Sequence, residues 1–201
     1  MRKLLLLSFF LVMAIASRAQ YHEYYTPDFT VVHDGVTYQC KIIDETNRKV
    51  YLFPHTDSYP AVQTLIVPEK LTAPDGIEYT VTELAAHFIN YNRPFPNMEE
   101  LILPKTLEHM ESSALWCSPY MKKLTIQALQ TYDAIGVICS TRDGHYLEEI
   151  RMLMETPPVN ISNWYGFFEL RTQKDKPFRI FVPLESTYRY KADKFFKYHT
   201  K

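Results

Sequence analysis

Large apolar residues recur along the middle of the chain in one figure, apolar-x-x-apolar-x-apolar. Segments 98–103 and 121–126 both carry it, as Met98, Leu101 and Leu103 and then as Met121, Leu124 and Ile126. All three positions shift by 23 residues between the two segments. A period of this length is typical of solenoids, in which each copy buries its apolar side against its neighbour.

The same figure returns at wider and less regular intervals on both sides of this pair. Further rows are Val62, Leu65 and Val67; Leu147, Ile150 and Met152; and the shortened pair Ile180 and Val182. A second figure lies between rows: Val81, Leu84, Phe88 and Ile89 match Leu107, Met110, Ala114 and Leu115 at an offset of 26. The two figures predict stacked strands, each followed by a turn-rich return.

The residues between the inward apolar positions are candidates for a ligand-binding face. Because side chains alternate between the two faces of a strand, an inward leucine leaves its neighbours pointing outward. An aromatic run at 163–170 adds a further candidate, although its side chains would equally suit packing against the flank of the stack. The candidates are Glu100, Ile102, Lys123, Thr125, Glu149, Arg151, Phe181 and Trp164.

Both ends of the repeat region carry elements of a different kind. Asp34-Gly35, between the alternating segments 29–33 and 36–43, predicts a two-residue hairpin turn, because both turn positions need positive φ. A further turn at 44–47 and a strand at 49–53 complete an antiparallel meander, which we expect to cover the open end of the stack. At the other end, Ser186 is a candidate helix N-cap. It precedes an apolar helical face of Tyr188, Ala192, Phe195 and Phe196.

The first 19 residues have the features of an export signal. Arg2 and Lys3 precede an apolar run from 4 to 15, and Ser17 and Ala19 are the small residues that favour cleavage before Gln20. A membrane anchor is the alternative, but the run is short for a bilayer span, and no later segment is apolar enough to cross. We therefore expect an exported chain, periplasmic or at the cell surface and exterior.

Charge excludes some classes of partner. The net charge of −1 becomes −4 when the three basic residues of the leader are removed. A weakly acidic chain is not drawn to nucleic acid or to anionic lipid. Three cysteines, Cys40, Cys117 and Cys139, allow one disulfide at most, in any of three pairings, and buried apolar thiols are the simpler interpretation.

No combination of residues predicts catalysis or metal binding. The seven histidines form no metal-binding motif, and His87 and His109, on neighbouring returns, suit structural roles. Cys139 and His145 are close only in sequence, which does not provide a nucleophile with an oriented base. The carboxylate pairs at 99–100 and 148–149 lie beside strand residues, so their members point to opposite faces. We expect no catalytic residue, cofactor or metal, and no enzyme activity.

The chain resembles the BspA-type leucine-rich repeat family of exported bacterial proteins, whose repeat reads LxxIxIPxxVxxIGxxAFxxCxx. Segments 29–40, 75–84 and 181–196 are similar to the family's N-terminal hairpin, inserted segment and closing segment. The repeat resemblance is carried by Leu101, Leu103, Pro104, Leu107, Met110, Ala114, Leu115 and Cys117. It implies a binding module associated with surface adhesion and protein binding, and it implies no active site.

Together these observations predict a mostly-β repeat fold of the α+β type, a short leucine-rich-repeat solenoid with a cap at each end. The expected parts are a signal peptide at 1–19, a β-hairpin cap at 20–60, the solenoid at 61–184 and a helical cap at 185–201. The predicted function is secreted, non-enzymatic binding of a protein or glycan at the bacterial surface. The alternatives are a structural envelope protein without a soluble ligand and, for the fold, an unrepeated α+β domain.

Overall fold

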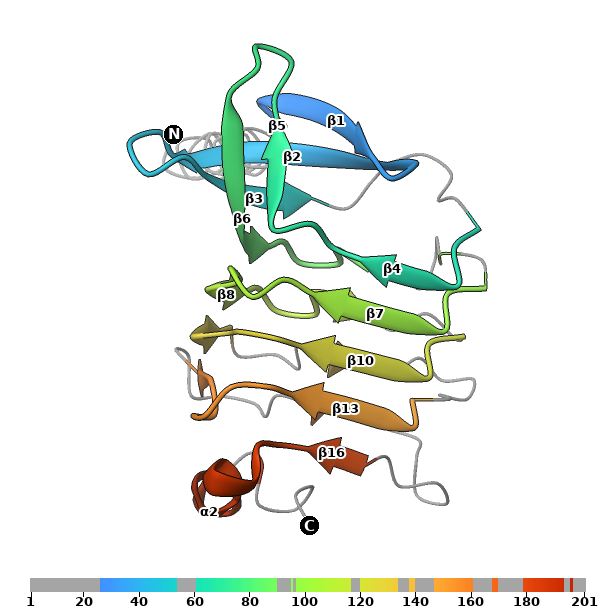
Figure 1. Ribbon diagram of the computed structural model, residues 1–201, viewed down its shortest axis with the longest axis vertical. Helices are drawn as coiled ribbons and strands as arrows, with labels where there is room; N and C mark the ends of the chain where they lie inside the picture. Colours follow the sequence, from blue (N-terminus) through green and yellow to red (C-terminus); the bar gives the residue numbers. More distant parts are fainter. Residues whose placement is uncertain are drawn as a thin grey trace, which may run out of the picture.

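The computed structural model describes residues 26–53, 61–89, 95, 97–116, 120–133, 138–139, 147–160, 168–169, 179–193 and 196. The expected leader and Trp164 lie outside these residues. The described part of the chain is mostly β, with three sheets and one short α-helix. Figure 1 shows the strands stacked along the long axis, with the N-terminal strands at one end and the helix at the other.

The N-terminal strands form the antiparallel meander that the sequence predicts. β1 (Phe29–His33) and β2 (Val36–Asp44) are joined by Asp34 and Gly35, whose φ angles of 50° and 77° are the positive values that the turn requires. β2 then pairs antiparallel with β3 (Lys49–Phe53). Tyr38 and Cys40 on β2 and Leu52 on β3 are buried. The predicted hairpin and third strand are therefore confirmed.

The meander is continuous with a sheet that runs the length of the stack. β3 pairs in parallel with β6 (Glu78–Leu84), which also receives the short antiparallel strand β5 (Lys70–Thr72). β8 (His109–Met110), β11 (Thr131–Tyr132) and β14 (Val159–Asn160) then follow in parallel. Hydrogen bonding thus crosses from the expected cap directly into the expected repeats.

A second sheet of five parallel strands occupies the face turned to the viewer in Figure 1. Its strands are β4 (Thr64–Ile66), β7 (Glu100–Leu103), β10 (Lys123–Ile126), β13 (Glu149–Met152) and β16 (Arg179–Phe181). Their register aligns one buried row of Leu65, Leu101, Leu124, Ile150 and Ile180. The strand rows predicted from the 23-residue repeat are confirmed in both position and register.

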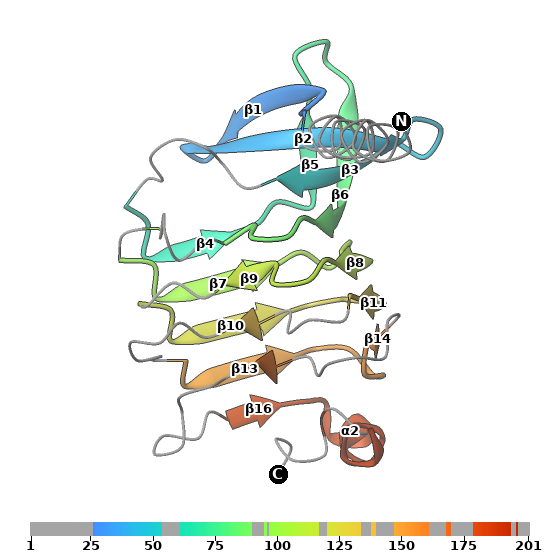
Figure 2. The same cartoon turned by 180° about the vertical axis from the view of Figure 1, so that it is seen from behind.

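The third sheet closes each pass of the chain. β9 (Leu115–Trp116), β12 (Ile138–Cys139) and β15 (Phe168–Glu169) pair in parallel and lie on the side shown in Figure 2. β7, β8 and β9 are consecutive in the chain, and each belongs to a different sheet. The next two passes repeat this order, so the apolar core is enclosed on three sides.

The second apolar figure forms the inner lining of the returns. Leu84 pairs with Met110, and Ile89 forms a parallel bridge with Leu115, as the 26-residue offset predicts. Tyr132, fully buried, continues this row beside Met110. Leu129 and Tyr132 follow Leu107 and Met110 by 22 residues, and the sequence analysis missed this third copy because a tyrosine replaces the aliphatic residue.

The C-terminal helix begins where expected, but its buried face differs. A 3₁₀ turn at Leu184–Ser186 leads into α2 (Thr187–Ala192). Tyr190 is buried, and its hydroxyl donates to the Met154 carbonyl at 3.2 Å, whereas the predicted core residue Tyr188 is exposed. The prediction of the apolar face was wrong because it assumed a longer regular helix, whose phase the preceding 3₁₀ turn changes. Phe196 is buried as predicted, and its ring meets that of Tyr190 edge-on.

Candidate functional site

The outward face of the five-stranded sheet carries two rows of side chains in strict register. The polar row consists of Thr64, Glu100, Lys123, Glu149 and Arg179, and the mixed row of Ile66, Ile102, Thr125, Arg151 and Phe181. In Figure 1 no described element lies in front of these strands. The structure therefore places seven of the eight predicted ligand-face residues on one surface; Trp164 lies outside the described residues.

Charges on this face alternate from one strand to the next. Each of three neighbouring strands begins with a charged pair: Glu99-Glu100, then Lys122-Lys123, then Glu148-Glu149. Parallel strands lie about 4.8 Å apart, so each cationic pair has an anionic pair on both sides. Lys122 Nζ lies 2.7 Å from Glu99 Oε1. That contact lowers the pKa of Glu99 and raises the pKa of Lys122. Much of the charge on the face is thus balanced within the protein.

Glu149 illustrates this internal balance most strongly. Its exposed fraction is 9%, and its carboxylate accepts a hydrogen bond from Arg151 Nε, two residues along the same strand. Arg151 itself stays exposed. Of the predicted contact residues in the described part, Glu149 is the one that the structure buries, because it lies between two strands that supply cations. A ligand on this face would meet Arg151 rather than Glu149.

Exposed apolar side chains gather at the C-terminal end of the face. Phe181, at the end of β16, is 44% exposed, and Leu153, directly after β13, is 53% exposed. Leu184 and Tyr188, in the 3₁₀ turn and α2, are 85% and 64% exposed. At the opposite end of the mixed row, Ile66 is 62% exposed. Since single exposed apolar residues are common, it is the grouping of four at one end that indicates a contact surface.

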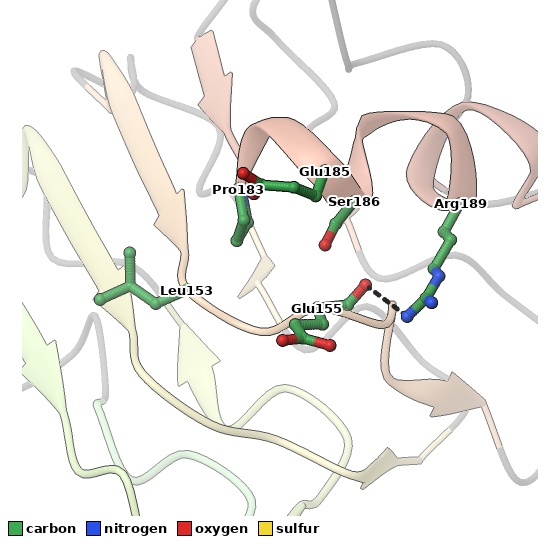
Figure 3. A pocket seen from close by; sticks show the side chains of 6 residues that line it. All are labelled: Leu153, Glu155, Pro183, Glu185, Ser186 and Arg189. Carbon is green, nitrogen blue, oxygen red and sulfur yellow. Dashed lines mark hydrogen bonds between the residues drawn. The ribbon is translucent and has the colours of Figure 1, made fainter.

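A pocket of about 390 Å³ lies beside this group, between the segment that follows β13 and the start of the C-terminal helix. Its lining residues are Leu153, Glu155, Pro183, Glu185, Ser186 and Arg189. In Figure 3 the side chains of Glu185 and Ser186 approach from one side of the pocket, and that of Glu155 lies on the other. The sequence gave no sign of this pocket, because two segments about 30 residues apart form it and their motifs predict only a strand end and a helix start.

The histidines and cysteines have structural environments. His109 Nδ1 lies 2.9 Å from the Thr131 hydroxyl, and its Nε2 lies 3.8 Å from a carboxylate oxygen of Asp133. His87 is half-buried in the turn after β6, and burial lowers its pKa. Cys40 is a free, buried thiol whose pKa burial raises to about 12. A thiol that stays protonated is a poor nucleophile.

Other candidate chemistry is limited to what the structure describes. Cys139 lies in β12, while His145 and Cys117 fall outside the described residues. Within the described ranges, no group of three or more His, Cys, Asp or Glu side chains is arranged to hold a metal ion. The same ranges contain no helix with the length and apolar character needed to cross a membrane.

Two solved structures resemble the chain at the level of backbone arrangement. One is a leucine-rich cell surface protein from Faecalibacterium prausnitzii A2-165, with 12% identity, a TM-score of 0.40, and coverage of 79% of this chain and 44% of that one. The other is the pneumococcal vaccine antigen PcpA, with 12% identity, a TM-score of 0.30, and coverage of 81% and 52%. The chain spans about half the length of these proteins. Neither a protein-family model nor a curated protein matches it.

Proposed function

We propose that this chain is an exported, non-enzymatic leucine-rich-repeat solenoid of the BspA type that binds a protein at the bacterial surface. The observation that carries the proposal is the uncovered mixed row of the five-stranded sheet. It ends in Arg151 and Phe181, beside the exposed Leu153. Arginine and aromatic side chains are the types that most often anchor protein partners.

The chemistry of the face favours a protein over a glycan as ligand. The acidic and basic pairs at the strand starts are balanced internally, so they give the face no strong net charge. What remains for recognition is apolar area with a guanidinium beside it, the combination found at the centre of protein interfaces. An extended sheet surface of parallel strands also provides the rigid backbone on which such contacts hold their geometry.

The experiment uses the exported form, residues 20–201, immobilised and presented with purified extracellular-matrix proteins and with a glycan array. For any ligand that binds, affinity is measured for the variants Lys123→Ala, Arg151→Ala and Phe181→Ala. We expect Arg151→Ala and Phe181→Ala each to weaken a protein ligand by about tenfold or more, as at interface hot spots. Lys123→Ala, whose charge is balanced by neighbouring strands, should have a smaller effect.

The matched controls are Ile43→Ala and Val159→Ala, which remove exposed apolar side chains from other sheets. These controls should leave affinity unchanged. A protein ligand bound equally well by all three face variants would show that the sheet face is not the site. Binding to glycans alone would replace the protein ligand with a sugar. No binding to either set would favour the alternative of a structural envelope protein.

A further inference from the structure

Resting on the proposed function, we infer that the pocket between Leu153 and the start of α2 receives a lysine side chain of the protein partner. The pocket adjoins the proposed binding face. Arg151 and Phe181 are aligned partners in the register of β13 and β16, and Leu153 and Pro183 lie two residues beyond each of them. A partner covering the mixed row would therefore reach the pocket.

Two carboxylates give the pocket its charge. Glu155 and Glu185 come from different segments and lie on opposite sides of the gap (Figure 3). Both residues are exposed, and neither forms an ion pair with a described residue. On the rest of the face the acidic side chains Glu99 and Glu149 have internal cationic partners. The pocket is thus the place where anionic groups remain available to a ligand.

A buried hydroxyl adds a third acceptor. Ser186 is only 2% exposed, and it occupies the N-cap position of α2 without capping a backbone N–H. Its hydroxyl is directed into the gap between the two segments, and no described residue forms a hydrogen bond with it (Figure 3). Since a buried hydroxyl without a partner is costly, this group favours a ligand that can hydrogen-bond with it.

Arg189 does not neutralise the pocket. Its Nε donates to the Tyr188 hydroxyl at 2.8 Å, and one terminal nitrogen donates to the backbone carbonyl of Glu155 at 3.4 Å, the dashed contact in Figure 3. The guanidinium carbon also lies 5.5 Å from the centre of the Tyr188 ring. Arg189 therefore braces the wall of the pocket through neutral groups and leaves both carboxylates to the ligand.

The geometry favours lysine over arginine. An ammonium group has three donors on a compact centre, which suits three acceptors that approach from different sides. A guanidinium is planar and pairs best with one carboxylate in two parallel hydrogen bonds, an arrangement that separated carboxylates do not offer. Leu153 and Pro183 supply an apolar wall for the methylene stem of lysine.

The test is a titration of the folded protein with the amide of Nα-acetyl-lysine, followed by the methyl resonances of Leu153. We expect a saturable shift in the millimolar range, the affinity typical of a single side chain. The uncharged analogue Nα-acetyl-norleucine amide should give no such shift. The double variant Glu155→Gln/Glu185→Gln should weaken lysine binding by about tenfold or more, which corresponds to about 1.4 kcal/mol.

Ser186→Ala should weaken binding by a few fold, and Glu45→Gln, an exposed carboxylate in the β2–β3 turn, is the matched control. Resonance dispersion of every variant verifies folding. The inference is overturned if lysine and norleucine bind alike, if the double variant binds lysine normally, or if lysine gives no shift. Loss of this result with an intact sheet-face ligand removes only the pocket, whereas a lysine-binding pocket without any sheet-face ligand removes only the proposed function.

Discussion

The antiparallel meander and the five-stranded parallel sheet achieve register by different means. In the meander, β1 and β2 are joined by Asp34 and Gly35, so the local turn decides which residues face each other. In the parallel sheet, hydrogen-bonded neighbours such as Leu101 and Leu124 are 23 residues apart in the chain. No turn can align strands over that distance. The stacked apolar row and the alternating charges must do so, because a shift by one residue would turn the core side chains outward.

The largest effect on this contrast should come from the buried row. Leu101→Ala removes a fully buried side chain between Leu65 and Leu124, and we expect a loss of about 2–5 kcal/mol in the free energy of unfolding. Ile102→Ala, on the same strand but facing outward, should cost less than about 1 kcal/mol. Urea denaturation of both variants measures the difference. Equal losses would mean that the row does not hold the stack together.

Much of the fold could be predicted because inward positions obey simple periodicity. The row of Leu65, Leu101, Leu124 and Ile150 was visible as a repeated figure, and the positive φ of Asp34 and Gly35 as a turn motif. The short strands of the second and third sheets have two residues each, for example β8 and β11, which is too few to show a period. The assignment to a leucine-rich-repeat family stays a proposal, since the repeat positions follow from packing alone.

The candidate site was less predictable, because outward positions obey no periodic rule. Strand alternation identified the side chains that face outward, but not that Glu149 would be buried against Arg151. The pocket depends on how the segment after β13 meets the segment after β16. That meeting is set by the 3₁₀ turn at 184–186, which also changed the buried face of the helix from Tyr188 to Tyr190. Such tertiary contacts leave no local signature.

A smaller effect should come from the turn that aligns the meander. Gly35→Ala places a side chain at φ 77°, where nothing lies within 4 Å of the new Cβ, so the cost is conformational rather than steric. We expect a loss of about 1 kcal/mol, from the strain of the left-handed region. Gly35→Asn is the matched control and should lose less, because asparagine tolerates positive φ. Hydrogen exchange should show the lost protection first in β1 and β2; a first loss in β7 or β10 would contradict a local role for the turn.

The smallest effect, and the most informative for the parallel sheet, should come from its alternating charges. Lys122→Glu combined with Lys123→Glu leaves three consecutive strands that begin with acidic pairs and removes the Lys122–Glu99 contact. Like charges on adjacent strands repel, so the thermal midpoint at low salt should fall, by less than in the two preceding cases because exposed charges are screened. Added salt should recover most of the loss.

Two further variants separate repulsion from the loss of attraction. Lys122→Gln with Lys123→Gln removes the attraction without adding repulsion, so its midpoint should lie between those of the wild type and the acidic variant. Adding Glu99→Lys and Glu100→Lys to the acidic variant restores opposite charges between β7 and β10, and it should recover part of the midpoint at low salt. If the acidic variant matches the wild type at low salt, the charges contribute nothing to register. The apolar row would then align the five strands alone, and the acidic and basic pairs would be free to serve a ligand.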